Sequence, residues 1–297
     1  MSTPEDTHLD NLENGGDESS NSSSPSVESV RDEDVPRYFD ERNNRLYHSH
    51  PHSPYPLPVD TPEQERLTVN HNVLKRLIGA NHRGPVDTVL TSNPDRRRNV
   101  LDLCTGNGKW VLEMAGQFGD AQFFGVDIGM FIDYVPDYRS LLDEVARLLR
   151  PGGLLLSVEW SKQLSFLPDS NLDIEEHAPA TFHFFDTVNH ILADTHGVSL
   201  DSADIQLLVT NSAHFLNVTT EQIYVPVGIW HENDVLTTIG SSFRAGQKKL
   251  AVSFKQMLLD SGMSAEEVDA LITDFTEEMH SVEGLVMVAH ITHAERA

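Results

Sequence analysis

The hydrophobic positions of the chain follow two periods, that of a strand and that of a helix, in alternating segments. Short apolar runs at residues 100–103, 122–126 and 154–158 predict buried strands. Between them, apolar residues recur every three or four positions at 110–114 and 141–149 and predict amphipathic helices. Strands that alternate with helices are typical of an α/β fold.

One more helix is predicted before the first strand, at residues 61–78. Thr61 is a suitable N-cap, Pro62 suits the first helical position and Gln64 completes a capping box. Gly79 predicts the end of this helix. Its apolar stripe consists of Leu67, Leu74, Leu77 and Ile78.

The second half of the chain is predicted to add three helices and two strands. Helices are expected at residues 179–194 and 241–259, and a capping box of Ser264 with Glu267 predicts the start of a third. The strands are expected at residues 217–227 and 284–292.

The turn that follows the first strand carries the candidate chemistry, and it comprises Cys104, Thr105, Gly106, Asn107 and Gly108. The two glycines lack a Cβ, so the backbone can turn tightly and a bulky ligand can lie against it. The second strand ends at Asp127, about 20 residues after Gly106, where a carboxylate can accept hydrogen bonds from two ribose hydroxyls. Together these residues predict half of a nucleotide-binding unit.

The neighbouring residues indicate which nucleotide the turn favours. Val111 occupies the third glycine position of a dinucleotide fingerprint, and Lys109 and Trp110 do not provide the lysine-serine ending of a phosphate loop. Asp102 would repel a pyrophosphate but could hold an ammonium group. The turn therefore favours a ligand with an amino-acid end and a ribose end, such as S-adenosylmethionine, and disfavours a nicotinamide oxidoreductase.

The segment from Asp102 to Gly108 resembles the acidic-x-Gly-x-Gly-x-Gly loop of the class I S-adenosylmethionine-dependent methyltransferases, with Cys104 in place of the first glycine. Three further stretches are similar to a fungal group of that superfamily, at residues 55–75, 137–160 and from 223 onward. The resemblance implies an α/β, Rossmann-like fold with extra helices covering the sheet. It also implies that the helix at 61–78 leans over the cofactor site.

The resemblance implies S-adenosylmethionine as co-substrate and assigns its contacts. Asp102 would hold the methionyl ammonium, Asp127 would accept from the ribose hydroxyls, and the turn would lie along the methionyl chain. The implied cofactor-binding residues are Asp102, Cys104, Thr105, Gly106, Asn107, Gly108, Asp127 and Ile128. Because methyl transfer is an in-line displacement, alignment of the reactants can supply much of the catalysis without a dedicated base. His231 and Glu232 are possible bases without further support.

The chain departs from the family after Asp127. Only residues 128–136 separate it from the helix that starts near Asp137, whereas the family places two further strand-helix units there. One crossover needs at least about 10–12 residues, so the third and fourth strands are expected to be missing. In the family these strands bring an acidic residue to the adenine and face the methyl group. The first and fifth strands flank the fourth, which leaves open their direct pairing in a shortened, five-stranded sheet.

Two functions of different classes remain open. The first is a methyltransferase that acts on a small-molecule or protein acceptor. The second is a non-catalytic, methyltransferase-derived interaction or scaffold protein, or a truncated gene product. The resembling group includes regulators of secondary metabolism that work in nuclear complexes, which is compatible with the scaffold alternative.

Composition limits the partners and the compartment. The net charge of −25 and the pI of about 4.8 disfavour nucleic acid, since its binding depends on neutralising phosphates. The single cysteine, Cys104, excludes an internal disulfide and suits a reducing compartment. No apolar stretch approaches the roughly 18 residues of a membrane span, and the amino terminus lacks a secretory core. We expect a cytoplasmic or nuclear protein that does not bind membranes.

The chain is expected to hold one methyltransferase-like domain at residues 55–297, after a tail. Residues 1–40 contain eleven acidic and two basic residues with a serine-rich block, which predicts disorder, and prolines extend the linker to residue 54. This acidic tail is the candidate site for a protein partner. The domain is divided into a cap-helix region, a cofactor-loop core and a final segment, at residues 55–98, 99–160 and 161–297.

The histidines do not predict a metal site. His48, His50 and His52 alternate in a proline-rich stretch that offers no preformed geometry. His183 and His190 share a helical face, but a polar outer face explains them. At the end of the strand at 154–158, Glu159 and Trp160 are expected on the ligand side, where Trp160 is either pocket wall or core.

Overall fold

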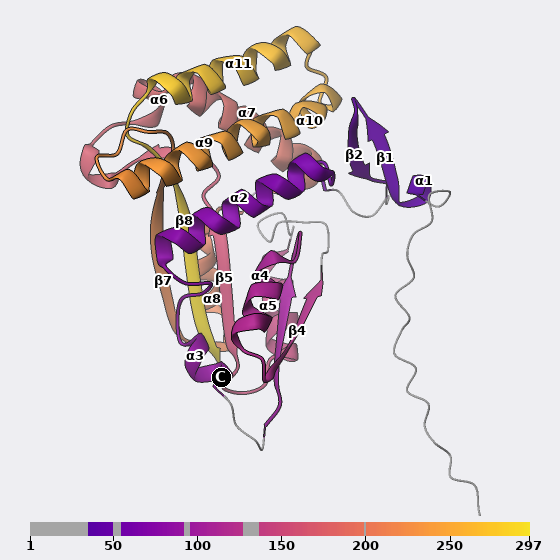
Figure 1. Cartoon of the computed structure of the whole chain (residues 1–297). Helices are drawn as coiled ribbons and strands as arrows, with labels where there is room; N and C mark the ends of the chain where they lie inside the picture. The colour runs from indigo at the N-terminus through magenta and orange to yellow at the C-terminus, as the bar shows by residue number, and fades with distance from the viewer. Residues whose placement is uncertain (1–34, 50–54, 92–95, 127–136, 199) are drawn as a thin grey trace, which may run out of the picture. The chain divides into compact units, whose positions relative to one another are not determined.

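The computed structural model describes residues 35–49, 55–91, 96–126, 137–198 and 200–297 (Figure 1). The chain divides into two compact units, Met1–Val35 and Pro36–Ala297, and all that follows concerns the second. The predictions for the acidic tail, for residues 128–136 and for the second and third linker histidines lie outside the described residues. The same holds for Asp127 and Ile128.

The larger sheet has four strands, and the last strand in the chain pairs with the other three. Strand β8 (Leu285–Arg296) pairs antiparallel with β5 (Leu154–Trp160) and β6 (Ser165–Phe166) along one edge. Strand β7 (Phe215–Pro226) pairs antiparallel with the other edge, since Ala289 is opposite both Trp160 and Ile223. The predicted strands at 154–158, 217–227 and 284–292 are thus confirmed and lie side by side.

The first two strands of the glycine-turn unit form a separate sheet. Strand β3 (Arg98–Leu103) pairs in parallel with β4 (Ala121–Val126). Among the described residues, β3 does not pair with β5, so direct pairing of the first and fifth strands is wrong. Instead, Val100 of β3 and Leu154 of β5 pack on one hydrophobic cluster around buried Met114. Side chains, and not backbone hydrogen bonds, connect the two sheets.

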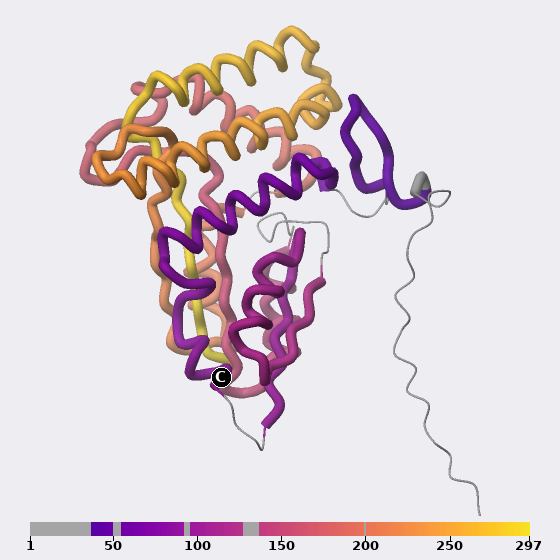
Figure 2. Tube along the Cα trace, in the orientation of Figure 1, coloured from indigo at the N-terminus to yellow at the C-terminus, as the bar shows by residue number. Residues whose placement is uncertain are grey.

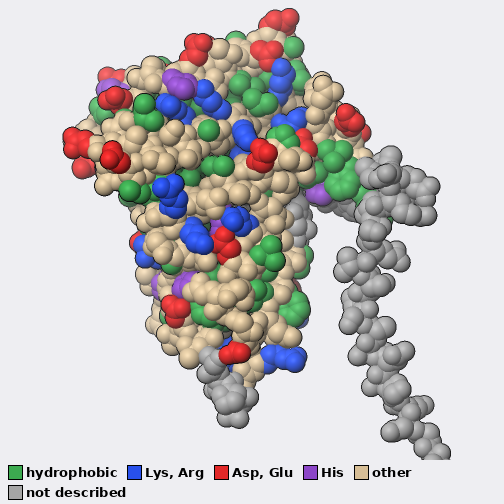
Figure 3. Space-filling model, viewed as in Figure 1, with side chains coloured by type: hydrophobic (Ala, Val, Ile, Leu, Met, Phe, Trp, Pro, Cys, Tyr) green, Lys and Arg blue, Asp and Glu red, His purple; other side chains and the backbone are tan. Residues whose placement is uncertain are grey.

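The β3–β4 pair leaves an apolar face open. Leu101 of β3 and Phe124 and Val126 of β4 are 45%, 52% and 43% exposed. These residues share a face, because side chains two apart on a strand point the same way. Figure 3 shows hydrophobic side chains along this part of the molecule. Parallel sheets normally have both faces covered, so this face lacks the cover that a complete α/β sheet has.

Apart from the two sheets, the described elements are helices and one small hairpin (Figure 2). A short hairpin of β1 (Phe39–Arg42) and β2 (Arg45–His48) precedes them, which composition did not predict. Among the described residues, no helix is both long enough and apolar enough to cross a bilayer. The helices are α1 (Val35–Tyr38), α2 (Thr61–Ile78), α3 (Val86–Leu90), α4 (Lys109–Gln117), α5 (Tyr138–Leu148), α6 (Ile174–His177), α7 (Pro179–His196), α8 (Ile205–Asn211), α9 (Asp234–Ser253), α10 (Lys255–Asp260) and α11 (Ala265–Ser281). Two single 3₁₀ turns lie at Pro168–Ser170 and Ser202–Asp204.

The main core lies where α7, α9 and α11 cover one end of the larger sheet (Figure 1). Phe184, Phe243 and Phe275 are fully buried there, and the rings of Phe184 and Phe275 stack with centroids 4.3 Å apart. A second cluster packs α5 and α8 on β7 and β8 around Leu142 and Val209. These clusters fix the carboxyl end of β5 beneath the helical layer.

The predicted ends of helices are most accurate where a local capping motif determines them. The capping box of Ser264 with Glu267 is confirmed, and Gly79 ends α2 in a left-handed conformation with φ 72°. The predicted cap of α2 is wrong by one residue, because Asp60 and not Thr61 accepts from the backbone N–H of Glu63.

The start of α9 was also predicted wrongly. The helix begins at Asp234, seven residues before the predicted 241. Asn233 caps it, since its side chain accepts from the N–H groups of Val235 and Leu236. The first turns contain threonines and a glycine, whose low helix propensity conceals the helix in the sequence.

Candidate functional site

The turn at residues 104–108 has a tight backbone with several left-handed residues. Its φ angles are 63° at Cys104, 53° at Gly106 and 71° at Gly108, all left-handed. The N–H of Thr105 donates to the carbonyl of Val126 at 3.2 Å, which ties the turn to the end of β4. Glycine adopts this backbone without steric cost, whereas Cys104 adopts it at a cost of about 1–2 kcal/mol.

The two glycines of the turn differ in what covers them. A Cβ on Gly106 would lie 3.2 Å from Cδ1 of Leu67, so α2 packs directly over this glycine. A Cβ on Gly108 would meet no atom within 4 Å. The backbone is therefore closed at Gly106 and accessible at Gly108. This arrangement places α2 against the turn, as the resemblance implied.

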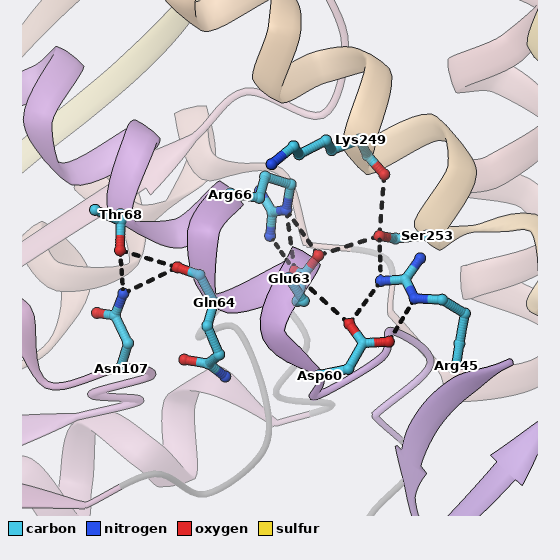
Figure 4. A network of polar contacts seen from close by, with 9 residues as sticks. All are labelled: Arg45, Asp60, Glu63, Gln64, Arg66, Thr68, Asn107, Lys249 and Ser253. Carbon is cyan, nitrogen blue, oxygen red and sulfur yellow. Dashed lines mark hydrogen bonds and ion pairs between the residues drawn. The ribbon is translucent and has the colours of Figure 1, made fainter.

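Asn107 links the turn to α2, as Figure 4 shows, and also to α4. Its Nδ2 donates to the carbonyl of Gln64 at 3.1 Å and to Oγ1 of Thr68 at 2.8 Å. Its Oδ1 accepts from the N–H of Lys109 at 3.2 Å, in the first turn of α4. The side chain is thus already bonded within the protein, so its part in ligand binding is limited to its backbone.

Asp102 and Thr105 lie at the base of the turn. Asp102 is half-buried on β3, opposite Gly125 in register. A Cβ on Gly125 would lie 2.7 Å from Oγ1 of Thr105, so this position has room only for glycine. Oγ1 of Thr105 is buried and has no hydrogen-bond partner in the described part of the chain. A buried orphan hydroxyl is uncommon and fits a site completed by a ligand.

Charged residues hold α2 against α4. Glu113 of α4 contacts Nζ of Lys75 at 2.6 Å and Nε2 of His71 at 3.1 Å, both on α2. Nζ of Lys109 lies 2.8 Å from its other oxygen. The hydrogen bonds from Lys109, Lys75 and His71 lower the pKa of Glu113 from 4.5 to about 2. The carboxylate therefore stays ionised at all ordinary pH values and cross-links the two helices.

The start of α2 carries a second, buried network (Figure 4). Nε of Arg66 donates to both oxygens of Glu63 at 3.0 Å, and both side chains are almost fully buried. Oγ of Ser253 on α9 lies 3.1 Å from Oε2 of Glu63. Glu63 and Arg66 are therefore buried residues of α2, together with Val73, and the predicted stripe of leucines did not include them. The only sequence signal is the spacing of three between opposite charges.

The hairpin β1–β2 joins this network through Arg45. Its Nε lies 2.5 Å and its Nη2 2.9 Å from the two oxygens of Asp60, a bidentate pair. Burial opposes ionisation of Asp60, but the hydrogen bond and charge of Arg45 hold its pKa below the usual value. The same carboxylate caps α2, so the hairpin fixes the residue at which the helix starts.

A cavity of about 100 Å³ lies beneath α2 at the carboxyl end of β5. Glu159 and Trp160 line it, together with residues of α2, α7 and α9. Their predicted place on a ligand side stays a prediction. The ring of Trp160 also stacks on Phe243 with centroids 5.2 Å apart. Trp160 is therefore both cavity wall and core.

Other candidate residues lie apart from the turn and the cavity. His183 and His190 are exposed on α7. His231 lies just before α9, where its Nδ1 accepts from the N–H of Asn233 at 3.1 Å. Neither His231 nor Glu232 lines the cavity. Within the described ranges, no group of three His, Cys, Asp or Glu side chains is arranged to hold a metal ion.

Comparison with known proteins points to one class. No family model matches the chain. It is 24% identical over 278 residues to methyltransferase pytC of Aspergillus terreus, covering 81% of this chain and 82% of the relative. It is 24% identical over 293 residues to the secondary metabolism regulator laeA of Coprinopsis cinerea, covering 84% and 70%. For the protein-methionine methyltransferase laeA of Emericella nidulans, the identity is 24% over 235 residues, covering 66% and 59%.

Solved structures show a looser similarity. Phosphoethanolamine N-methyltransferase 2 of Haemonchus contortus, in complex with S-adenosylmethionine, matches 78% of this chain and 52% of its own length with a TM-score of 0.37 and 13% identity. A structure titled as a putative sarcosine dimethylglycine methyltransferase of Galdieria sulphuraria matches 78% of this chain and 86% of its own length, with a TM-score of 0.34 and 11% identity.

The described strands and helices form a mixed α/β fold. More particularly, the chain is related to the class I S-adenosylmethionine-dependent methyltransferases of the fungal laeA and pytC kind.

Proposed function

We propose that the chain binds S-adenosylmethionine at residues 104–108 and transfers its methyl group to an acceptor. The observation that carries the proposal is the left-handed turn between two parallel strands, with accessible backbone at Gly108 and an orphan hydroxyl on Thr105. Kinship with S-adenosylmethionine-dependent methyltransferases supports the same ligand.

The chain offers defined positions for the cofactor. Asp102 would hold the methionyl ammonium, and the backbone at Gly108 would lie along the methionyl chain. Asp127 would accept from the ribose hydroxyls, and Ile128 is a further candidate beside it; both lie outside the described residues. When bound, S-adenosylmethionine supplies an electrophilic methyl group. The residues of the chain then have to align it with a nucleophile at about 3–3.5 Å, which needs no dedicated base.

A shortened sheet is part of this proposal. Its support is the length of the segment 128–136, together with the exposed apolar face of the two-stranded β3–β4 sheet. A sheet without the third and fourth strands offers fewer contacts to the adenine and to the acceptor, so weak cofactor binding is expected.

A non-catalytic scaffold is the second candidate. It is favoured by Leu67, which packs over Gly106, and by Asn107, whose side chain is bonded to α2. Both contacts would keep the turn closed without a ligand. In this alternative the cofactor turn is an inherited structural feature.

Calorimetric titration with S-adenosylhomocysteine separates the two candidates. The wild-type chain should bind saturably, and Asp102→Asn should weaken binding about tenfold or more, because a hydrogen bond to a charged group contributes about 1.5–3 kcal/mol. Asp194→Asn is the matched control at an exposed site on α7 and should bind as the wild type does. Absence of binding by a monodisperse, cooperatively melting chain would leave the scaffold.

A further inference from the structure

Two cations on α9 have no counter-charge in the described part of the chain. Arg244 and Lys248 are four positions apart, so their side chains share one face of the helix. Both are half-buried, and neither side chain forms an ion pair or a hydrogen bond among the described residues. The adjacent Lys249 differs, because its Nζ lies 2.6 Å from Oε2 of Glu65 on α2. In a chain with 46 acidic and 21 basic residues, two neighbouring half-buried cations without a carboxylate partner are unexpected.

A third basic side chain lies beside these two. His280 is in the last turn of α11. Partial desolvation, followed by the positive charges of Arg244 and Lys248, lowers the pKa of His280. Figure 3 shows Lys or Arg side chains next to a His side chain on this part of the helical layer. The three groups therefore gather at one place on the surface, between α9 and α11.

The loop that follows β7 places the guanidinium group of Arg244 at this point. A Cβ on Gly228 would lie 3.5 Å from Nη1 of Arg244 and 3.6 Å from Cδ1 of Trp230. The same Cβ would lie 3.9 Å from the carbonyl oxygen of Met279, the residue before His280. The end of the Arg244 side chain is therefore close to the backbone that carries the imidazole, beside an indole ring.

Neighbouring groups of the chain do not neutralise this charge. The carbonyl end of a helix such as α11 attracts cations, but its partial charge is only about half of one elementary charge. Glu278 is two positions before His280, and its oxygens accept from two N–H groups in the first turn of α7 at 3.2 and 2.6 Å. This carboxylate is thus committed to the start of another helix. The full charges of Arg244 and Lys248 remain largely uncompensated.

The donors of the cluster fit one compact anion that carries more than one charge. The guanidinium group of Arg244 can donate two parallel hydrogen bonds, and the ammonium group of Lys248 can donate a third. The imidazole of His280 can donate another from a ring nitrogen. A phosphate monoester carries close to two negative charges at pH 7 and has three acceptor oxygens. A carboxylate has one charge and two oxygens, so it would leave part of the cluster without a partner.

We propose that Arg244, Lys248 and His280 form a binding site for a phosphate monoester. None of the three residues lines the cavity beneath α2 or belongs to the glycine turn. The site is therefore separate from the proposed cofactor turn, and its existence does not depend on methyl transfer. A small phosphorylated metabolite and a phosphorylated protein side chain present the same group to it, so the experiment compares both.

Magnetic resonance of the histidine rings in the full chain tests the site. The probes are inorganic phosphate, a blocked glycine peptide with one phosphoserine, and acetate, all at equal ionic strength. The signal of His280 is assigned by its loss in His280→Gln. Both phosphate probes should move this signal saturably, with dissociation constants of the order of 1 mM, as expected for a few exposed charge-assisted hydrogen bonds. They should also raise the pKa of His280, because a bound anion offsets the neighbouring cations.

The comparison of probes identifies the ligand. Acetate should bind at least about fivefold more weakly than phosphate, because it carries half of the charge. Tighter binding of the phosphopeptide than of inorganic phosphate would assign the site to a phosphorylated side chain, and the reverse order would assign it to a small phosphorylated molecule. An equal response to acetate and phosphate, or an unmoved His280 signal, would overturn the proposal.

Two adjacent lysines provide a matched pair of variants. Lys248→Gln removes an unpaired charge and should weaken phosphate binding at least about fivefold, because a charge-assisted hydrogen bond is lost. Lys249→Gln makes the same change one residue further on, where the lysine pairs with Glu65, and should alter the affinity by less than about twofold. Glutamine and lysine have similar helix propensities, so both variants should keep a cooperative thermal transition. Equal losses of affinity in the two folded variants would indicate general attraction of anions and contradict the site.

Discussion

Replacement of Glu113 by glutamine tests how α2 is held against α4, which begins directly after the glycine turn. The carboxylate joins Lys75 and His71 of α2 to Lys109 at the start of α4. Glutamine keeps the size of the side chain and removes its charge. The variant should therefore lose the electrostatic part of this cross-link and keep the packing.

The size of the effect follows from the pKa of Glu113. Its lowering from 4.5 to about 2 corresponds to at most about 3.4 kcal/mol of unfolding free energy. The Glu113 side chain is 24% exposed and that of Lys75 is 41% exposed, so solvent screening reduces this to about 1–2 kcal/mol. Because the folded pKa is the lower one, this stabilisation is complete above about pH 4.5 and disappears as the pH falls toward 2.

Urea unfolding at pH 7 and at about pH 3 measures this difference. Glu113→Gln should be less stable than the wild type by about 1–2 kcal/mol at pH 7 and by less than half of that at the lower pH. Glu144→Gln is the control, because Glu144 pairs with Arg147 at 2.8 Å with both side chains more than 60% exposed, and it should cost less than about 0.5 kcal/mol. An equal loss at both pH values, or one no larger than the control, would refute the reasoning.

Three further substitutions test backbone positions by the same unfolding assay. Cys104→Gly should stabilise the chain by about 0.5–1 kcal/mol, since glycine relieves the left-handed strain, whereas Cys104→Ala should give no gain. Gly246→Ala should stabilise α9 by about 0.5–1 kcal/mol, because its Cβ would meet only ordinary contacts at 3.6–3.7 Å. Gly240→Ala should destabilise by about 3 kcal/mol or more, because its Cβ would lie 2.1 Å from the carbonyl oxygen of Gly228. Effects of equal sign at the two α9 glycines would contradict the described packing of that helix.

Local chemistry made much of the fold predictable from the sequence. The strand, turn, helix and strand of the β3–β4 unit follow from apolar periods and from glycines placed between them. The capping box at Ser264 and the left-handed glycine after α2 depend on residues a few positions apart. Such features do not depend on distant contacts, so the sequence pattern is sufficient to predict them.

The features that the sequence did not predict depend on contacts between residues far apart in the chain. Asp60 and Thr61 are both good caps, and the ion pair of Asp60 with Arg45 of the hairpin favours Asp60. The two sheets meet through side chains packed around Met114, a contact between distant segments that no local pattern expresses.

The candidate site also contains some residues that local sequence patterns predict and others that they do not. The glycine turn at residues 104–108 is visible in the sequence because the spacing of its glycines is a local signal. The buried pair Glu63–Arg66 and the buried Gln247 look like ordinary helix-surface residues, since polar side chains are mostly exposed. Only the packing of α2 on α9 turns them inward.

Hydrogen–deuterium exchange with and without saturating S-adenosylhomocysteine tests the central claim most directly, because it locates the ligand as well as detecting it. The account predicts slower exchange in peptides that cover residues 104–117 and the first half of α2, with little change in α11. Saturable binding without protection at residues 104–117, or protection confined to a distant region, would contradict the assignment of the cofactor to the glycine turn.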